Sequence, residues 1–565
     1  MRKSAIFLLF VAFCLTILGL SAQGGIAVPP QTARPKTEAE GKQKPEDSKQ
    51  RPVAKSKVYL LHSDLLRKDA THPDAQIVTG NVRFRHDSVY MYCDSACYYD
   101  KVSSFEAFGN VKMVQGDTLF LYGDRLYYDG LTQIAEMRCN VRMENRTTTL
   151  LTDSLNYDRV YNLGYFFDGG TLMDEQNVLT SEWGEYSPQT KQSVFNYNVK
   201  LVNPQFTLTS DTLRYNTASK IADIVGPSDI WSDANHIYSE KGTYNTVTGK
   251  ADLYDRSVLT NQGKQLTGDT LFYDRNTGVG EVFSRMVMTD TINRNMLTGE
   301  YGYYNEQTDY AFATDSAVAI DYSQGDSLFL HADTLLMETF HQNTDSMFRE
   351  MRAFHKVRFY RTDVQGTADS LVFSTVDSCL TMYRDPIIWN KNQQLLGEVI
   401  KVYMNDSTID WSHIIGQALS VERVDSTIYN QVTGKEMKSY FTNGEMRKTE
   451  VIGSVRVVYY PMDSDSTLIG MNVSETSKLE IYLQDRKIER MVMSPKSNGV
   501  LYPMSQIPAG KDRLESFVWF DYIRPLNKAD IFNWREKRVE DQLKKNVRGP
   551  VVLPNARLFE NKKEE

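Results

Sequence analysis

Apolar and polar residues alternate with a period of two along most of the chain beyond residue 57. One recurring element reads acid–x–Leu–x–Tyr–Asp/Asn, as in residues 124–129 and 211–216. A period of two places alternate side chains on opposite faces of an extended strand, whereas a helix would scatter the Leu and Tyr positions around its axis. Turn-forming groups such as residues 246–249 and 276–278 bound these elements. The pattern therefore predicts β-strands joined by short turns.

The strand elements also recur at a nearly constant interval. From Asp124 to Asp269 the leading acids follow one another every 29 residues, and a second element, Gly/Asn–Val–x–apolar, recurs between them. A fixed period of this size is typical of stacked units that bury their faces on one another. We therefore predict an all-β fold over residues 58–499, an elongated, repetitive β-jelly-roll or solenoid of stacked 29-residue units. The leading acids are Asp94, Asp124, Asp153, Glu182, Asp211, Glu240, Asp269, Glu300, Asp333, Asp369 and Glu398.

The alternation also predicts which side chains face inward. The Leu and Tyr of the element share one face of the strand, and we expect them to line the interior of a two-walled stack. We expect the leading acid at the rim, where it closes a turn. The candidate interior residues, and hence the candidate ligand-binding residues, are Leu126, Tyr128, Leu155, Tyr157, Leu213, Tyr215, Leu271 and Tyr273.

In three copies a glycine stands where the others have Leu, at Gly184, Gly242 and Gly302. A glycine there leaves a space in the predicted interior. Either a neighbouring side chain or a bound ligand has to fill it.

The N-terminus has the features of a secretory signal. An apolar run over residues 5–20 follows two basic residues and ends in the small residues Ser21 and Ala22. The run is too short to span a bilayer as a helix, which needs about 20 residues. We predict a signal peptide over residues 1–22; a lipid anchor at Cys14 and a retained anchor are the alternatives.

Two further regions flank the repeats. Residues 23–57 are rich in Pro, Gln, Lys and Glu and poor in aromatics, which predicts a disordered tether. Residues 500–565 lose the repeat and are interpreted as a C-terminal cap with a charged tail. Within them, residues 527–545 are predicted to form a short helix, which either caps the stack or docks a partner.

Composition supports strands and excludes several kinds of chemistry. The chain has 33 Tyr and 25 Phe, residues that suit pleated sheets. A net charge of −8 over 565 residues gives no basic field for nucleic acid. The eight His lack metal-ligand spacing, and no nucleophile elbow, phosphate-binding glycine loop or Cys-x-x-Cys is present. We therefore expect no enzyme activity, no metal and no cofactor.

Four cysteines follow the predicted signal peptide, at Cys93, Cys97, Cys139 and Cys379. A Cys97–Cys139 disulfide between neighbouring strands is one interpretation. Small buried thiols are the other.

The two alternating elements resemble those of the OstA-like family, which includes the lipopolysaccharide-transport protein LptA and the N-terminal domain of LptD. The resemblance rests on residues 109–113 alternating with residues 123–129, and on residues 453–457 and 479–483, and it covers roughly residues 58–495. It implies a twisted β-jelly-roll trough in which lipid A acyl chains move through an apolar interior. It also implies that open sheet edges pair with other lipopolysaccharide-transport proteins. The chain departs from the family in its length and its added C-terminal region.

The resulting prediction is a periplasmic lipid-binding bridge protein for lipopolysaccharide transport to the outer membrane. Its expected partners are lipopolysaccharide or lipid A and other transport proteins, through which it would associate with the outer or inner membrane. An exported β-solenoid that serves adhesion or scaffolding without lipid cargo is the alternative. A carbohydrate-active β-solenoid enzyme is a third, but it requires a cleft of non-repeating acids that the sequence does not reveal.

Overall fold

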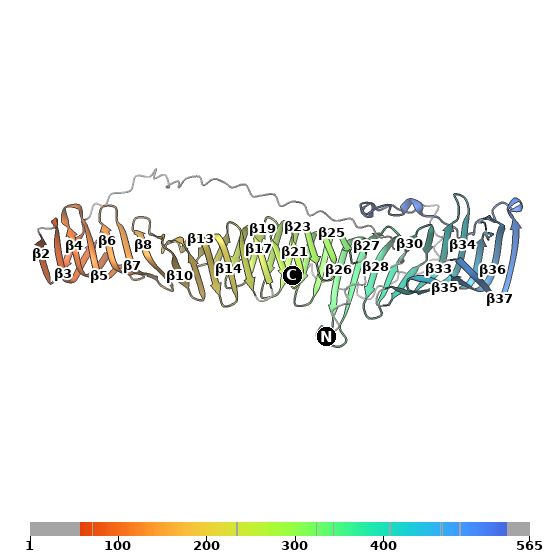
Figure 1. The fold of residues 1–565 in the computed structure, drawn as a ribbon, viewed down its shortest axis with the longest axis horizontal. Coiled ribbons are helices and arrows are strands. Elements are labelled where there is room, and N and C mark those ends of the chain that lie inside the picture. Colours follow the sequence, from red (N-terminus) through yellow and green to blue (C-terminus); the bar gives the residue numbers. More distant parts are fainter. Residues whose placement is uncertain are drawn as a thin grey trace, which may run out of the picture. The chain divides into compact units, whose positions relative to one another are not determined.

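The computed structural model describes residues 57–69, 72–232, 235–323, 325–342, 344–405, 408–463, 465, 467–484 and 487–538 (Figure 1). The described residues form 37 strands and four short 3-10 turns, and the strand pairs are antiparallel. The predicted all-β, repetitive fold is confirmed. The predicted signal peptide and all of the predicted tether except Lys57 lie outside the described residues.

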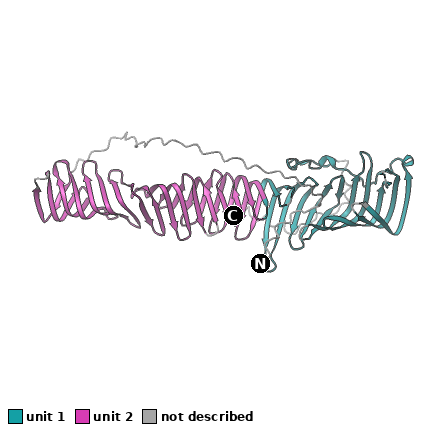
Figure 2. Cartoon of the chain, viewed as in Figure 1, with its two compact units in different colours: residues 1–16, 293–295, 314–565 teal, residues 17–292, 296–313 magenta. Residues whose placement is uncertain are grey.

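The structure divides into two compact units (Figure 2). Among the described residues, the N-terminal unit comprises residues 57–292 and 296–313, and the C-terminal unit comprises residues 293–295 and 314–538. The strands that lie wholly or mainly in the N-terminal unit are β1 (Tyr59–His62), β2 (Leu65–Asp69), β3 (His72–His86), β4 (Val89–Tyr99), β5 (Ser104–Gln115), β6 (Leu119–Asp129), β7 (Ile134–Asn145), β8 (Thr148–Asp158), β9 (Leu163–Phe166), β10 (Gly170–Asp174), β11 (Asn177–Ser181), β12 (Trp183–Tyr186), β13 (Gln192–Asn203), β14 (Phe206–Asn216), β15 (Ile221–Ile224), β16 (Ser228–Ser232), β17 (Asn235–Ser239), β18 (Lys241–Asn245), β19 (Lys250–Tyr254), β20 (Val258–Asn261), β21 (Lys264–Thr267), β22 (Thr270–Asp274), β23 (Val279–Asp290) and β24 (Asn295–Asn305).

The strands that lie mainly in the C-terminal unit are β25 (Tyr310–Asp321), β26 (Leu328–Phe340), β27 (Phe348–Tyr360), β28 (Val364–Ser374), β29 (Cys379–Tyr383), β30 (Ile387–Asn390), β31 (Gln393–Leu396), β32 (Val399–Met404), β33 (Ile409–Arg423), β34 (Tyr429–Thr442), β35 (Glu445–Tyr459), β36 (Gly470–Gln484) and β37 (Lys487–Pro503). The 3-10 turns are η2 (Asp100–Val102), η3 (Met504–Gln506), η4 (Asp521–Ile523) and η5 (Asp530–Phe532).

In the N-terminal unit, long strands are shared between two walls. The first half of β8 pairs with β10, and its last residues pair with β9. β14 divides in the same way between β16 and β15. We call the wall that contains β10, β11, β16, β17, β20 and β21 wall A, and the wall that contains β9, β12, β15, β18, β19 and β22 wall B. Short strands stay in one wall, and long strands cross from one wall to the other.

The crossing point of each long strand is a bulged corner. At the first clear corner Gly109 and Asn110 adopt left-handed backbone conformations, with φ of 73° and 46°. The Asn110 amide donates to the Asp94 carboxylate over 2.8 Å, and Asn140 and Asn198 bind Asp124 and Glu182 across the same 16-residue separation. The Asn side-chain amide of the Gly/Asn–Val–x–apolar element therefore binds the leading acid of the acid–x–Leu–x–Tyr element.

This corner corrects one expectation about the leading acids. Asp94 lies inside β4 and is exposed, and it does not close a rim turn. The physical reason is the bulge, which interrupts the alternation and leaves the acid outside while the following Leu and Tyr positions point inward. The residue that closes the turn is the last of the element, since Asp129 and Asn245 accept hydrogen bonds from the backbone two residues later.

The turns of wall B also bind one another. Lys220 and Gly249 adopt left-handed conformations at equivalent turn positions. The backbone N–H of Thr246 donates to the Lys220 carbonyl oxygen over 2.9 Å, and that of Arg275 donates to the Gly249 carbonyl oxygen over 3.1 Å. These bonds explain the constant 29-residue period, because an inserted residue would break the contact between successive turns.

In the C-terminal unit the same two-wall pairing holds, and a further segment covers one wall. β33 pairs with β32 through residues 409–415 and with β31 through residues 419–422. The wall that contains β30 and β31 is here called the covered wall. Figure 1 shows residues 504–538, in the darkest blue, returning along this unit, and we call this segment the strap.

The strap does not contain the predicted helix. Of residues 527–545, those up to 538 are described, and they form only the 3-10 turn η5 and irregular backbone. The physical reason is local: the Asn527 and Asp530 side chains bind backbone N–H groups and fold the segment into tight turns. Residues 539–545 lie outside the described residues.

None of the four described cysteines forms a disulfide, so the predicted Cys97–Cys139 pair is not formed. Cys93 and Cys379 are buried, and burial raises the pKa of the Cys93 thiol to about 12. Cys139 is exposed, because it occupies the corner position that Gly109 occupies one repeat earlier.

The two-walled interior predicts a strong effect of shortening an inward side chain. Leu213 is fully buried, whereas its neighbour Arg214 is exposed. We expect Leu213→Ala to destabilise the N-terminal unit by about 2–5 kcal/mol, because it removes buried apolar surface and leaves a cavity. Arg214→Ala, the matched control, should change stability by less than about 0.5 kcal/mol. Urea unfolding followed by circular dichroism measures both, and equal effects would contradict the assignment of the faces.

Candidate functional site: an apolar groove between the walls

The eight residues predicted to line the interior all point inward. Their exposed fractions lie between 0 and 3%. The residues are Leu126, Tyr128, Leu155, Tyr157, Leu213, Tyr215, Leu271 and Tyr273. These side chains are enclosed between the two walls of the described part of the unit.

The glycine positions show how completely this interior is filled. A Cβ atom added to Gly184 would lie 2.5 Å from the Phe166 ring and 3.0 Å from the Phe195 ring. At Gly302 the added atom would lie 2.8 Å from the Met286 side chain. Of the two interpretations left open by the sequence, filling by neighbouring side chains therefore holds at Gly184 and Gly302.

A row of tyrosine hydroxyls closes the mouth of the N-terminal unit. The Tyr215 hydroxyl donates to the buried Asp174 carboxylate over 2.8 Å, and the Lys220 ammonium group binds the same oxygen over 2.8 Å. Asn235 donates to the Tyr273 hydroxyl over 2.8 Å. These bonds join wall B to the turns of wall A, and we call the row the polar seam. Its tyrosines are Tyr128, Tyr157, Tyr186, Tyr215 and Tyr273, whose wall A partners are His86, Gln115, Asn145, Asp174 and Asn235.

Tyr128 and Tyr215 of the seam remain protonated at neutral pH. Burial raises the pKa of Tyr128 to about 12, although the neighbouring Arg159 opposes the shift. Burial and the Asp174 charge also raise the pKa of Tyr215. The Tyr215 hydroxyl therefore keeps the proton that it donates to Asp174.

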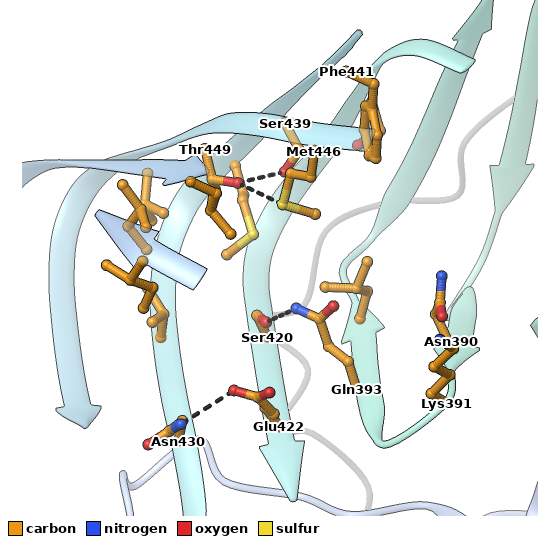
Figure 3. Close-up of a pocket in the computed structure, with 18 of the residues that line it drawn as sticks. Asn390, Lys391, Gln393, Ser420, Glu422, Asn430, Ser439, Phe441, Met446 and Thr449 are labelled. Atoms are coloured by element: carbon orange, nitrogen blue, oxygen red, sulfur yellow. Dashed lines mark hydrogen bonds between the residues drawn. The ribbon is translucent and has the colours of Figure 1, made fainter. Parts of the chain in front are cut away.

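An open groove lies instead inside the C-terminal unit (Figure 3). Its volume is about 320 Å³, within the range of about 300–1,000 Å³ of small-molecule sites. β31, β33, β34, β35, β36 and β37 line it, with the greater part of the lining apolar. The apolar lining residues are Leu395, Val432, Met437, Phe441, Met446, Val451, Ile481, Leu483, Ile488 and Met491.

Polar side chains in the groove bind one another. Ser439 and Thr449 share a hydrogen bond of 3.0 Å, and Gln393 donates to Ser420 over 3.0 Å. Because these groups satisfy one another, the groove presents little unpaired polarity to a ligand.

Charged and amide side chains gather toward one end of the groove lining. Figure 3 shows Glu422 and Asn430 at the lower end, away from Phe441, Ser439 and Thr449 at the upper end. The Asn430 amide donates to the Glu422 carboxylate over 3.1 Å. A ligand with a polar head and an apolar body matches this distribution.

The sequence contains a signal for the groove that the repeat pattern hides. Counted from the corner glycine, Ser412 and Ser420 of β33 occupy the inward positions of Phe105 and Met113 in β5, and Ser439, which pairs with Ser412, occupies the position of Tyr128. Smaller inward side chains leave space between the walls. The Leu and Tyr pattern does not identify this region, because smaller residues replace the large inward side chains there.

The covered wall is buried on both faces. Ile387, Trp389 and Leu419 pack outward against Phe520 and Ile523 of the strap. The adjacent run from Ile387 to Trp389 is buried throughout and does not alternate. An unbroken apolar run of this kind indicates a sheet with both faces covered.

Buried glutamines hold the strap backbone. Gln394 accepts from the Phe520 N–H over 2.8 Å and donates to the Val518 carbonyl oxygen over 3.0 Å. Gln431 binds the Leu514 N–H and the Asp512 carbonyl oxygen in the same way, each over 2.8 Å. Both side chains bind the backbone as a neighbouring strand would, which fixes the strap along the outer face of this wall.

Two further classes of site are not present in the described residues. No described helix has the length and apolarity that a membrane span requires. Within the same residues, no group of three or more His, Cys, Asp or Glu is arranged to hold a metal ion.

Comparison with known proteins gives one family. A family model described as OstA-like protein matches residues 55–211, 206–269 and 230–322. The three matches overlap and together cover most of the N-terminal unit. No curated protein matches the chain.

The glutamine contacts predict how the strap responds to substitution. Gln394→Leu removes both hydrogen bonds to the strap and leaves the Phe520 N–H and Val518 carbonyl groups without these partners. We expect a local cost of about 1–3 kcal/mol and faster hydrogen exchange at the Phe520 amide. Gln393→Leu is the matched control. Gln393 lines the groove, and its side chain donates to Ser420 on β33 and not to the strap backbone. Equal exchange rates in the two variants would show that Gln394 does not hold the strap.

Proposed function

Because the chain is an OstA-like protein over residues 55–322, we propose that it is a non-enzymatic, lipid-binding bridge protein for lipopolysaccharide transport to the outer membrane. We place it in the periplasm. The observation that carries the proposal is the apolar groove between the walls of the C-terminal unit. Acyl chains cannot cross water unaided, and each buried CH2 group contributes about 0.8 kcal/mol to their transfer into such a groove.

The shape of the groove mouth supports an amphiphilic cargo. Acyl chains would lie against Met437 and Val451, and the polar head would face Lys391 and Asn430 at the mouth. The filled interior of the N-terminal unit would bind lipid only when the polar seam opens. Lipid contact at the eight residues first predicted from the sequence therefore stays a prediction, and the groove is the site we propose for the conformation described.

Photo-crosslinking tests the cargo. We expect a photoreactive side chain at Met437, which faces the groove, to capture a lipid A-type lipid, and one at the adjacent Lys438 to capture none. Mass spectrometry of the crosslinked protein from a cell envelope identifies the lipid. A further variant, Ser439→Trp, should fill the groove and lower lipid capture severalfold, with Ser439→Ala as its control.

The packed N-terminal interior favours one competing function, an exported scaffold or adhesion protein without lipid cargo. That function predicts no lipid capture at Met437 and no effect of Ser439→Trp on any bound lipid. Those two results together would contradict the transport proposal and support the scaffold function.

We propose that the sheet edge at β37 pairs with another lipopolysaccharide-transport protein. β37 is the terminal strand of the C-terminal unit and pairs with β36 (Figure 1). Ile488, Val500 and Leu501 along it are exposed, Leu501 by 54%. An exposed edge strand with apolar side chains adds a partner strand readily.

Crosslinking from the edge tests this partner. A photoreactive side chain at Leu501 should capture a second protein in the cell envelope. Val376, which is 69% exposed on the turn between β28 and β29, provides the control position and should capture none. Capture at both positions, or at neither, contradicts pairing at β37.

A further inference from the structure

The end of the strap carries an exposed apolar surface of its own. Leu526, Phe532 and Trp534 have exposed fractions of 68%, 48% and 41%. They lie within a nine-residue stretch: Leu526 precedes η5, Phe532 is its last residue, and Trp534 follows it. We call residues 524–538 the strap loop.

A buried carboxylate fixes the conformation of the strap loop. Asp530 accepts hydrogen bonds from the Leu526 backbone N–H over 3.0 Å and from the Asn533 amide over 3.1 Å. The Arg535 guanidinium binds the same carboxylate over 2.9 Å. Although burial opposes it, these donors hold the pKa of Asp530 down to about 2, so the group is ionised at any physiological pH.

The underside of the loop is anchored to the sheet. Ile531 is fully buried, and η5 packs against β26 and β27. The buried guanidinium of Arg358 lies 3.8 Å from the Asp530 carboxylate. Because Asp530 and Ile531 are held on the inside, the flanking Leu526 and Phe532 side chains are held on the outside.

The charge of the strap loop is opposite to that of the whole chain. Residues 524–538 contain five Lys or Arg and two Asp or Glu, while the protein has a net charge of −8. Lys528 and Arg538 are exposed beside the apolar side chains. Arg538 lies over the Tyr522 ring at 4.5 Å, and Lys537 lies over the Phe520 ring at 4.7 Å.

We propose that the strap loop docks the protein on an anionic lipid bilayer surface. Leu526, Phe532 and Trp534 would enter the boundary between headgroups and acyl chains. Lys528 and Arg538 would bind the anionic headgroups. Aromatic and aliphatic side chains surrounded by cations are the composition of segments that lie on a membrane. The rigid clamp at Asp530 lowers the entropic cost of docking, since the loop is already in its docked conformation.

Vesicle co-sedimentation of the full chain tests the proposal. We expect binding to phosphatidylcholine vesicles that contain phosphatidylglycerol, weaker binding to pure phosphatidylcholine, and weakening by added salt. The triple variant L526S/F532S/W534S should lower the partition coefficient roughly tenfold or more. The control Val376→Ser removes an equally exposed apolar side chain elsewhere on the unit and should leave the partition coefficient unchanged.

Two further measurements make the outcome decisive. The Phe532 ring lies 4.8 Å from the His331 ring, so the thermal midpoint is compared in the double variant L526S/W534S, which keeps that contact and should have the midpoint of the unchanged protein. A fall in the midpoint of the double variant, or no vesicle binding by the unchanged protein, would mean that protein covers these side chains and would overturn membrane docking. Binding that the triple variant retains would overturn it as well.

The inference is independent of the lipid cargo. The groove-filling variant Ser439→Trp should retain vesicle binding, since the groove and the strap loop are different surfaces. Loss of vesicle binding in Ser439→Trp would instead assign the vesicle lipid to the groove. The two proposals can therefore fail separately.

Discussion

The corner hydrogen bond between an amide and an acid on the preceding strand is the contact on which the architecture depends. A β-strand cannot turn from one wall into another without interrupting its ladder, and the bulge at each corner makes that turn possible. Gly109 and Asn110 adopt the left-handed conformations that the bulge needs, and Asp94 binds the Asn110 amide. Where the asparagine is absent, Arg285 binds Asp269 through two hydrogen bonds of 2.9 and 2.7 Å. Because long strands bend at such corners, the sheet encloses its own interior.

The size of the inward side chains then decides whether the interior is filled or open. In the N-terminal unit the tyrosines span the interior, and their hydroxyls reach the opposite wall, as Tyr215 reaches Asp174. In the groove of the C-terminal unit Ser439 and Thr449 bind each other and leave the width of the trough unoccupied. The same backbone arrangement therefore encloses buried tyrosines in the N-terminal unit and a ligand-sized groove in the C-terminal unit.

The strands and the inward positions could be predicted from the sequence because both follow from local alternation. Leu213 and Tyr215 were assigned to the interior on that basis, and both are fully buried. The role of the leading acids could not be predicted in this way, since a bulge shifts the alternation by one residue and moves Asp94 from the inner face to the outer corner. The position of the strap could not be predicted from local pattern either. Gln394 binds Phe520, which lies 126 residues later in the sequence, and no periodicity relates the two residues. The predicted helix failed for a local reason, because the Asn527 and Asp530 side chains bind nearby backbone N–H groups and fold the segment into tight turns.

The strap also determines which wall can move. The covered wall packs against the strap on one face and lines the groove on the other, so a displacement of this wall would break contacts on both faces at once. Trp389 is fully buried there and donates to Gln394, which itself holds the strap. The strap contacts made by Trp389, Gln394 and Leu419 belong to the covered wall, whereas Met437 and Val451 belong to the opposite wall. Widening of the groove by the opposite wall would leave those strap contacts intact. We therefore expect the strands that pair through residues 436–452 and 478–482 to move when a larger cargo enters, against a surface that the strap fixes.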